Sequence, residues 1–324
     1  MSVRILRPAA KRLLAQFGVR VVRIERGGSP PEPPREAPAA PAPPAVHPSL
    51  AFAPPGHFYS PIPDLAEVER NSGALFSTER KEMRGIDLRE SRQLELLEEC
   101  VPFYRDQPFT PTRTERTRYF FENPAYSYSD AIFYYLVLRR FRPRRLIEIG
   151  SGYSTCIALD TDELFLGSSL EMTCIEPYPR LMKSLVRSAD LSRITLRPEA
   201  LQETPLEVFD QLGKDDVLFI DSTHVSRIGS DVNRLFFDVL PRLEPGVLVH
   251  IHDVFYPFEY PRHWVMEGRA WNEIYVLRAF LEFNDRFEIL LFNTYLTEFH
   301  RKFVEERFPL CLRNTGGSLW LRVV

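Results

Sequence analysis

Two groups of titratable side chains close apolar runs in the second half of this sequence. Asp221 and His224 follow the run VLFI, and His252 and Asp253 end the run LVHIHD. An imidazole with its ordinary pKa of about 6.5 can take the proton of a hydroxyl group at neutral pH, and a nearby carboxylate can orient it. We therefore predict that His224 is a general base beside Asp221 or Asp253, with His252 as the next candidate.

A glycine-rich turn supplies a second element of chemistry. The segment IEIGSGYST places Glu148, Gly150, Ser151 and Gly152 between an apolar run and the start of a helix. Glycines let the backbone turn tightly and approach a ligand, and a helix start offers unpaired N–H groups. Thr155 stands where a dinucleotide-binding turn would carry its third glycine. The turn therefore indicates a ligand site of another kind, or an ordinary strand-to-helix connection.

Another acid ends the next apolar run along the chain. Glu176 closes MTCIEP, and a carboxylate in this position of an open α/β sheet can accept both hydroxyls of a ribose. The following run, ITLRP, leads to Glu199, Ala200 and Leu201, which would lie beside an adenine. The alternative for Glu176 is a solvated acid at a strand end.

These residues need a parallel sheet to bring them together. From Pro143 on, short apolar runs alternate with amphipathic stretches, and the runs are RLIEIG, MTCIEP, ITLRP, DVLFID, GVLVHIHD, FEILLFN and SLWLRVV. Such runs are typical of buried strands, and their alternation with helices predicts a doubly wound α/β domain over residues 143–324. The carboxyl ends of the strands would then form the ligand-binding crevice.

The chain before that domain has two parts. Residues 57–142 carry helical patterns, with Ser127 or Ser129 as a cap, and predict a helical extension. Residues 1–56 join a basic segment to a linker in which eleven of the 27 residues from Ser29 to Pro55 are proline, and predict a disordered tail. The alternative for the basic segment is a short amphipathic helix that makes weak contact with an anionic membrane surface or a partner.

Composition and charge exclude several classes of protein. Hydrophobic residues make up 44% of the chain, and no apolar run reaches the length of a transmembrane helix. The net charge is −3, but residues 1–28 are basic, so the remainder is acidic and no nucleic-acid partner is predicted. The four cysteines lack metal or disulfide spacing, and the N-terminus lacks a signal-peptide core. We therefore predict a cytoplasmic protein with reduced thiols.

Together, IEIGSGYST, FIDSTH and LPRLEPGVLVHIHD resemble the class I S-adenosylmethionine-dependent methyltransferases, in the methyltransferase domain 24-like branch often found near small-molecule and sugar-modifying genes. The resemblance covers about residues 119–324. It implies a Rossmann-like sheet of seven strands in the order 3-2-1-4-5-7-6, with an antiparallel pair formed by the last two runs. It also implies that S-adenosylmethionine binds with its methionine part at the glycine turn, its ribose on the acid of the second strand and its adenine after the third. The implied cofactor-binding residues are Glu148, Gly150, Ser151, Gly152, Glu176, Ala200, Leu201 and Asp221.

Some relatives of that family bind magnesium through several acids at the carboxyl ends of the fourth and fifth strands. Here those ends offer Asp221 and Asp253, whereas Thr223 and His252 stand where further carboxylates would be expected. Because Mg²⁺ prefers oxygen ligands, we predict a site without a metal. The alternative is a metal-assisted mechanism with Asp221 and Asp253 as ligands and His224 behind them.

An aromatic segment, VFYPFEYPRHWVMEGRAWNE, follows Asp253. Its prolines argue against a helix through its first half, and a loop of this length beside a crevice is typical of a lid or an acceptor-binding wall. Aromatic faces with Glu259, Arg262 and His263 would suit a sugar ring or another flat acceptor. The alternative is a loop that simply packs onto the N-terminal helices.

The combined prediction is a methyltransferase that uses S-adenosylmethionine to methylate a hydroxyl group of a small molecule or sugar. One alternative is an NAD- or nucleotide-sugar-binding enzyme on the same sheet, against which the absent third glycine and the absent Tyr-xxx-Lys pair count. Another is a non-catalytic binding protein with a methyltransferase-like pocket. The sequence leaves the acceptor and the oligomeric state open.

Overall fold

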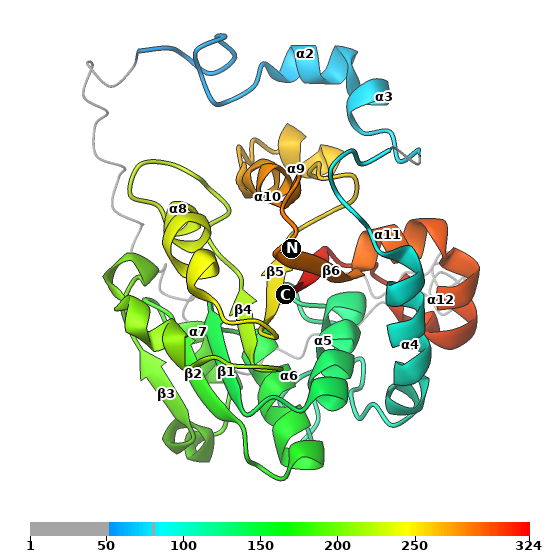
Figure 1. The fold of residues 1–324 in the computed structure, drawn as a ribbon, viewed down its shortest axis with the longest axis vertical. Helices are drawn as coiled ribbons and strands as arrows, with labels where there is room; N and C mark the ends of the chain where they lie inside the picture. Colours follow the sequence, from blue (N-terminus) through cyan, green and yellow to red (C-terminus); the bar gives the residue numbers. More distant parts are fainter. Residues whose placement is uncertain (1–51, 80–81) are drawn as a thin grey trace, which may run out of the picture. The chain divides into compact units, whose positions relative to one another are not determined.

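The apolar runs after Pro143 form the strands of one sheet in the computed structural model, which describes residues 52–79 and 82–324. The strands are β1 (Arg145–Ile149), β2 (Glu171–Ile175), β3 (Ile194–Arg197), β4 (Val217–Ile220), β5 (Leu248–His252), β6 (Phe287–Phe292) and β7 (Ser318–Val323). Their order across the sheet is β3-β2-β1-β4-β5-β7-β6 (Figure 1). The predicted α/β class, the seven strands and their order are therefore confirmed.

The first five strands run parallel, and their register decides which residues meet. Ile149 of β1 pairs with Ile175 of β2 and with Ile220 of β4, and Ile220 pairs with Ile251 of β5. These strands therefore end at one level of the sheet. The residues that follow the paired isoleucines come together at this edge, and they are Gly150, Glu176, Asp221 and His252.

β7 lies between β5 and β6 and runs opposite to the parallel strands. It pairs antiparallel with both β5 and β6, as the resemblance implied for the last two runs. The register between β6 and β7 shifts between Ile289 and Leu291.

Strand side chains alternate between two hydrophobic cores, one on each face of the sheet, because successive residues of a strand point to opposite faces. Leu146 and Phe219 belong to the first core, and Ile147 and Leu218 belong to the second. The helices that contribute to the first core are α4 (Glu90–Arg105), α5 (Tyr128–Phe141), α6 (Tyr153–Thr161), α7 (Arg180–Leu185) and α12 (Arg301–Arg307). Those that contribute to the second are α8 (Asp231–Arg234) and α10 (Glu273–Leu281), while α11 (Asn293–Phe299) contributes to both.

The helical extension contains α2 (Leu65–Arg70), α3 (Ser72–Leu75), α4 and α5 within the described residues. Asp64 caps α2, since its side chain accepts a hydrogen bond from the backbone N–H of Ala66 at 2.8 Å. Ser127 precedes α5 as predicted, but its hydroxyl donates to the carbonyl of Phe121 at 2.7 Å instead of capping the helix.

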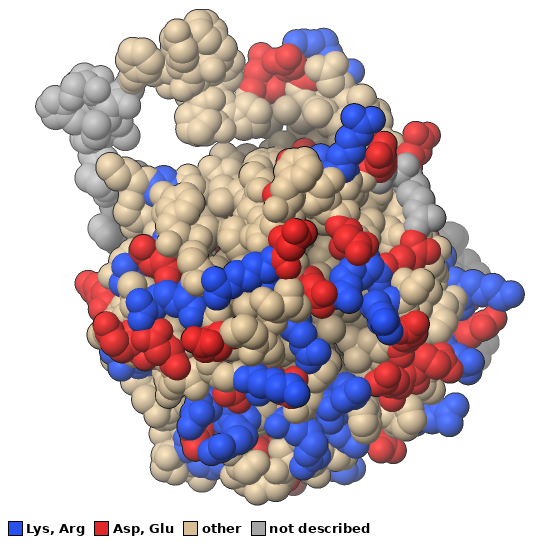
Figure 2. Space-filling view, in the orientation of Figure 1, with Lys and Arg blue, Asp and Glu red and all other residues tan. Residues whose placement is uncertain are grey.

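Ala53–Val324 form one compact unit. The predicted disordered tail, residues 1–56, lies almost entirely outside the described residues. Within the parts that the structure describes, none of the helices has the length and apolar character that a bilayer crossing requires. On the face drawn in Figure 2, acidic and basic side chains are interspersed over the lower half, and the surface above them is largely uncharged.

Candidate active site

A cavity of about 370 Å³ opens at the carboxyl edge of the parallel strands. Of the residues predicted to bind a cofactor, those that line this cavity are Gly150, Glu176, Ala200, Leu201 and Asp221. Residues from four different strand ends therefore share one space, as the register requires.

Gly150 is held in a conformation that only glycine adopts without strain. Its φ is +79°, and a Cβ atom there would collide with the backbone carbonyl oxygen of Asp221. The Gly150 N–H donates to the carbonyl of Ile175 at 3.1 Å, and the Asp221 N–H donates to the carbonyl of Ile149 at 2.9 Å. The turn is thus tied to both neighbouring strand ends. Gly152 differs, because a Cβ there would meet only Leu181 at 3.5 Å.

Glu148 lies beneath the turn and not in the cavity. Its side chain is 0% exposed, and it accepts hydrogen bonds from the hydroxyls of Ser154 at 2.6 Å and Thr155 at 2.5 Å. The same Thr155 oxygen accepts the N–H of Gly152 at 3.0 Å. Burial raises the pKa of Glu148 to about 7, although these hydroxyl hydrogen bonds oppose the shift. We therefore revise the expectation that Glu148 touches a ligand: it positions the turn.

Thr155 also explains why the third glycine of a dinucleotide-binding turn is absent. Its hydroxyl links the buried acid to the helix start, and a glycine could not make that link.

Glu176 keeps its carboxylate at the rim of the cavity. One oxygen accepts the N–H of Ser151 at 3.1 Å and the other accepts the N–H of Tyr178 at 2.7 Å. The side chain is partly exposed and lines the cavity, and a carboxylate oxygen with one partner can accept further hydrogen bonds from a ligand. Ser151 therefore takes part through its backbone.

His224 lies among three carboxylates. Its Nδ1 is 2.8 Å from Glu273, and its Nε2 is 3.4 Å from both Asp221 and Asp253. Burial alone would lower its pKa, but the hydrogen bonds and charges of these acids outweigh burial and raise the pKa to about 10. The three acids therefore favour the protonated imidazole, which counts against the predicted role of His224 as a neutral general base. The ring also lies 4.5 Å from that of Trp271.

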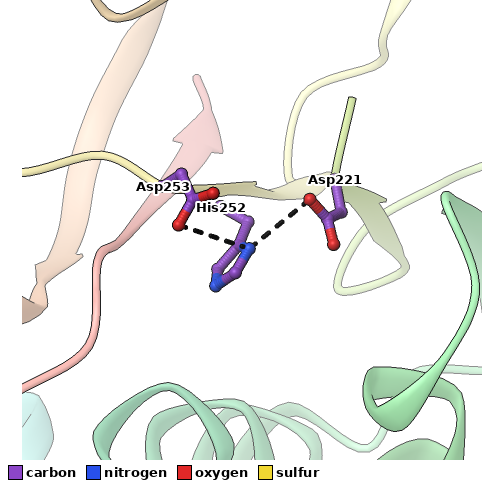
Figure 3. Close-up of side chains that lie close together, drawn as sticks. All are labelled: Asp221, His252 and Asp253. Atoms are coloured by element: carbon purple, nitrogen blue, oxygen red, sulfur yellow. Dashed lines mark ion pairs between the residues drawn. The ribbon is translucent and has the colours of Figure 1, made fainter. Parts of the chain in front are cut away.

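His252 also lies close to Asp221 and Asp253, the two aspartates that His224 contacts. Its Nδ1 is 3.4 Å from Asp221 and 3.8 Å from Asp253 (Figure 3). Its Nε2 is 3.7 Å from Asp130. These acids raise the pKa of His252 well above its usual value, although burial opposes them. The resulting cluster alternates carboxylates and imidazoles in the order Asp130, His252, Asp221 with Asp253, His224, Glu273.

Two members of this cluster were missed from the sequence. Glu273 begins α10 and is 1% exposed; it accepts from His224 and also from the Ser222 hydroxyl at 2.9 Å. Asp130 lies in α5 and accepts the N–H of Gly317 at 3.0 Å. The sequence does offer one signal for both residues, because each is an acid within a largely apolar helical stretch. A buried acid is costly unless it is paired, so such an acid indicates a buried partner.

The backbone is strained on both sides of this cluster. His224 has φ +60° and Asp253 has φ +57°, in the left-handed region that residues with side chains seldom adopt. Such strain persists where the surrounding structure fixes a side chain in a functional position.

Asp221, His252 and Asp253 could hold a metal ion, because their ligand atoms lie within 4.8 Å of one another. The Nδ1 atom of His252 is buried, and no hydrogen bond within the described residues satisfies it. The sequence offers the two aspartates as oxygen ligands, and the structure adds the imidazole of His252 as a third donor. With His252 in its neutral form, these three donors fit a divalent cation.

His250 has no part in this cluster's chemistry. It is fully buried, its ring stacks on Phe219 at 4.0 Å, and its Nε2 lies 3.2 Å from the hydroxyl of Tyr126. His250 lies inside β5 and not at its end, and a histidine in such a position is usually packed in the core.

The aromatic segment after β5 forms one wall beside the cluster. It is a loop up to the short helix α9 (Arg262–Met266), as its prolines indicated. Its rings follow one another from Phe255 to Trp264 at 5.2 Å and from Trp264 to Trp271 at 5.4 Å, and Trp271 contacts His224. Arg262 also pairs with Glu69 of α2, so the segment contacts the N-terminal helices as well.

Comparison with known proteins points to one family. Residues 147–254 match the model of a family described as a methyltransferase domain. The resemblance drawn from the sequence is confirmed, and the predicted enzyme class and its S-adenosylmethionine cofactor agree with this match.

Among curated proteins, the chain is 40% identical over 129 residues to an uncharacterized protein of Archaeoglobus fulgidus. The aligned part covers 39% of this chain and 58% of that protein, so the match spans little more than half of the relative's length.

Solved structures with similar folds include the S-adenosylhomocysteine-bound methyltransferase PaMTH1 of Podospora anserina, at 16% identity and a TM-score of 0.40 over 80% of this chain and 96% of that one. An O-methyltransferase family 2 protein of Planctomyces limnophilus, in complex with apigenin, is 13% identical with a TM-score of 0.29 over 72% of this chain and 61% of that one.

Proposed function

We propose that this chain is an S-adenosylmethionine-dependent methyltransferase that methylates a hydroxyl group of a small molecule or sugar. The observation that carries the proposal is the shared strand edge, where Gly150, Glu176 and Asp221 line one cavity and the carboxylate–imidazole cluster adjoins it. The methyltransferase family match over residues 147–254 covers all of these strand ends and supports the same proposal.

In this cavity the cofactor lies across the strand ends. Its methionine part approaches the turn from Gly150 to Gly152, where the absent side chains leave the backbone open. Its ribose hydroxyls donate to Glu176, whose carboxylate is already fixed by two backbone N–H groups. Its adenine lies along Ala200 and Leu201, because these apolar residues form the cavity wall beyond the second strand.

Methyl transfer is a single displacement. The acceptor oxygen forms a bond to the methyl carbon, the bond between that carbon and the sulfonium sulfur breaks, and the sulfur keeps the electron pair. The acceptor must also lose its hydroxyl proton. Because three carboxylates favour the protonated form of His224, we assign proton acceptance to Asp253 and not to His224 when no cation is bound. His224 donates from Nε2 toward Asp221 and Asp253 and fixes their orientation.

A divalent cation fits the donor set of Asp221, His252 and Asp253. When bound, it would lower the pKa of a hydroxyl group placed beside it. Asp130 then supports His252 on the side of the ring away from the two aspartates, as outer carboxylates do for ligating histidines.

Calorimetry with S-adenosylhomocysteine tests the proposal, with NAD as the competing ligand. We expect S-adenosylhomocysteine to bind and NAD not to bind. Glu176→Ala removes two charge-assisted hydrogen bonds to the ribose and should weaken binding at least about tenfold. Glu171→Ala is the matched control, because Glu171 lies at the opposite end of β2 and pairs with Arg145 on the surface. Binding of NAD, or equal affinity of both variants, would contradict the proposal.

A further inference from the structure

A second cavity, of about 380 Å³, lies beside the aromatic segment. One wall is the loop from Phe255 to Arg262, and another is α11 with the start of α12, including Glu298 and Arg301. The cavity is also lined by Phe76, which follows α3, and by Thr315, which precedes β7.

Two of these walls continue directly into the carboxylate–imidazole cluster. Phe255 follows Asp253 by two residues, and its ring is packed against Gly317 so closely that a Cβ there would collide with it. Thr315 precedes Gly316, which is packed in the same way against the carboxylate of Asp130. Two segments of the cavity wall are therefore continuous along the chain with residues that belong to the cluster or pack against it.

The lining combines aromatic faces with balanced charge. Phe76 and Phe255 are partly exposed, so their rings are available to a ligand. Arg301 and Glu298 are exposed at the rim, and within the described residues neither side chain makes an ion pair or a hydrogen bond. Because Arg301 and Glu298 carry opposite charges, the rim favours neither an anionic nor a cationic ligand. The guanidinium group supplies hydrogen-bond donors for hydroxyl groups, and the carboxylate supplies acceptors.

We propose that this cavity binds the methyl acceptor as an uncharged, polyhydroxylated ring, such as a sugar unit. The C–H face of such a ring packs on aromatic side chains, and its hydroxyls bond the charged pair at the rim. The cavity volume is in the range of small-ligand sites. One hydroxyl then points past Phe255 toward Asp253. This inference rests on the proposed function, since it names the acceptor class of the same site.

Saturation-transfer difference NMR on the full chain, saturated with S-adenosylhomocysteine, tests the inference. The probes are methyl β-D-glucopyranoside, methyl α-L-rhamnopyranoside and, as a flat anionic ring, 3,4-dihydroxybenzoate. We expect saturation transfer to the glycosides and little to the benzoate. Arg301→Ala should weaken glycoside binding about tenfold. Lys302→Ala should leave it unchanged, because the neighbouring Lys302 is exposed and does not line the cavity.

The outcomes separate the two proposals. If S-adenosylhomocysteine does not bind in calorimetry, the proposed function fails. If it binds but neither glycoside receives saturation, or the benzoate is preferred, the acceptor class is wrong. If glycosides bind equally to the Arg301 and Lys302 variants, the cavity is not their site.

Discussion

At the scale of single residues, the arrangement around His224 decides what the site can do. Glu273 at 2.8 Å and two aspartates at 3.4 Å surround one buried imidazole. A buried carboxylate cluster of this kind is stable only when positive charge compensates it. His224 and His252 supply that charge when they are protonated, and a cation at Asp221, His252 and Asp253 would take the place of the His252 proton.

The first prediction concerns turnover. His224→Ala removes the group that fixes Asp221 and Asp253, and should lower kcat about a hundredfold. S-adenosylhomocysteine affinity should change little, because His224 does not line the cofactor cavity. Turnover assays and calorimetry on the same preparation measure the two effects. A variant with near-normal turnover would refute the role given to His224.

The second prediction concerns a cation. Chelation with EDTA should lower turnover, and added Mg²⁺ should restore it, because three donors converge at Asp221, His252 and Asp253. Asp253→Asn should abolish the restoration. Full activity after exhaustive chelation would contradict this prediction and would support the metal-free mechanism predicted from the sequence.

The third prediction concerns stability and pH. The folded-state pKa of Glu148, about 7, lies above its ordinary value of 4.5, so the folded chain holds this proton more tightly than the unfolded chain. The protein should lose stability as the pH rises from about 5 through 7. Glu148→Gln cannot ionise, so its stability relative to the wild type should improve by on the order of 2 to 3 kcal/mol between pH 5 and pH 8.

Denaturant unfolding across that pH range measures the effect. Glu171→Gln is the control, since Glu171 is exposed in its pair with Arg145. A parallel pH dependence in both variants would show that Glu148 is not the source.

At the scale of elements, the parallel register is what assembles the site. β1, β2, β4 and β5 end at one level, so residues far apart in the chain meet without any long-range sequence signal. In the turn between β1 and α6, Gly150 packs so closely against the backbone of Asp221 that no Cβ atom fits there. The close approach of the β1 and β4 ends therefore depends on a glycine at position 150.

The fourth prediction compares two glycines with the same φ of +79°. Gly167→Ala should cost about 1 kcal/mol of unfolding free energy, from the left-handed backbone alone, because open space surrounds it. Gly150→Ala should cost at least about 2 kcal/mol more, since its Cβ meets the Asp221 carbonyl. It should also weaken S-adenosylhomocysteine binding. Equal losses in denaturant unfolding would show that the close approach carries no energy.

At the scale of the whole molecule, Ala53–Val324 contain the sheet, both hydrophobic cores and both cavities. The proline- and alanine-rich segment from Ser29 to Phe52 offers few apolar side chains to bury, and it separates the basic residues 1–28 from the rest of the chain. The functional unit therefore begins near Ala53.

The fifth prediction follows from this division. A chain that starts at Ala53 should bind S-adenosylhomocysteine as the full chain does, and its melting temperature should lie within about 3 °C of it. Calorimetry and thermal unfolding measure both quantities. A large fall in melting temperature would show that the preceding segment contributes to the fold.

Local patterns were enough to predict the elements that carry the site. The seven apolar runs became seven strands, because apolar runs between turn-forming residues are decided within a few positions. The strand order came from the family resemblance, and the structure has the same order. Strand-end residues such as Glu176 and Asp221 were found because a parallel sheet places them predictably.

Tertiary structure alone decided the charges and partners of those residues. Glu273 lies 49 residues from His224 in the chain, and only the packing of α10 brings its carboxylate to the imidazole. Glu148 lies beneath the turn and not in the cavity, because the hydroxyls of Ser154 and Thr155 hold its carboxylate there. The sequence thus determined which residues stand at the sheet edge, since periodicity is local. The structure determined their charged partners and their direction, because both depend on neighbours that the chain brings in from elsewhere.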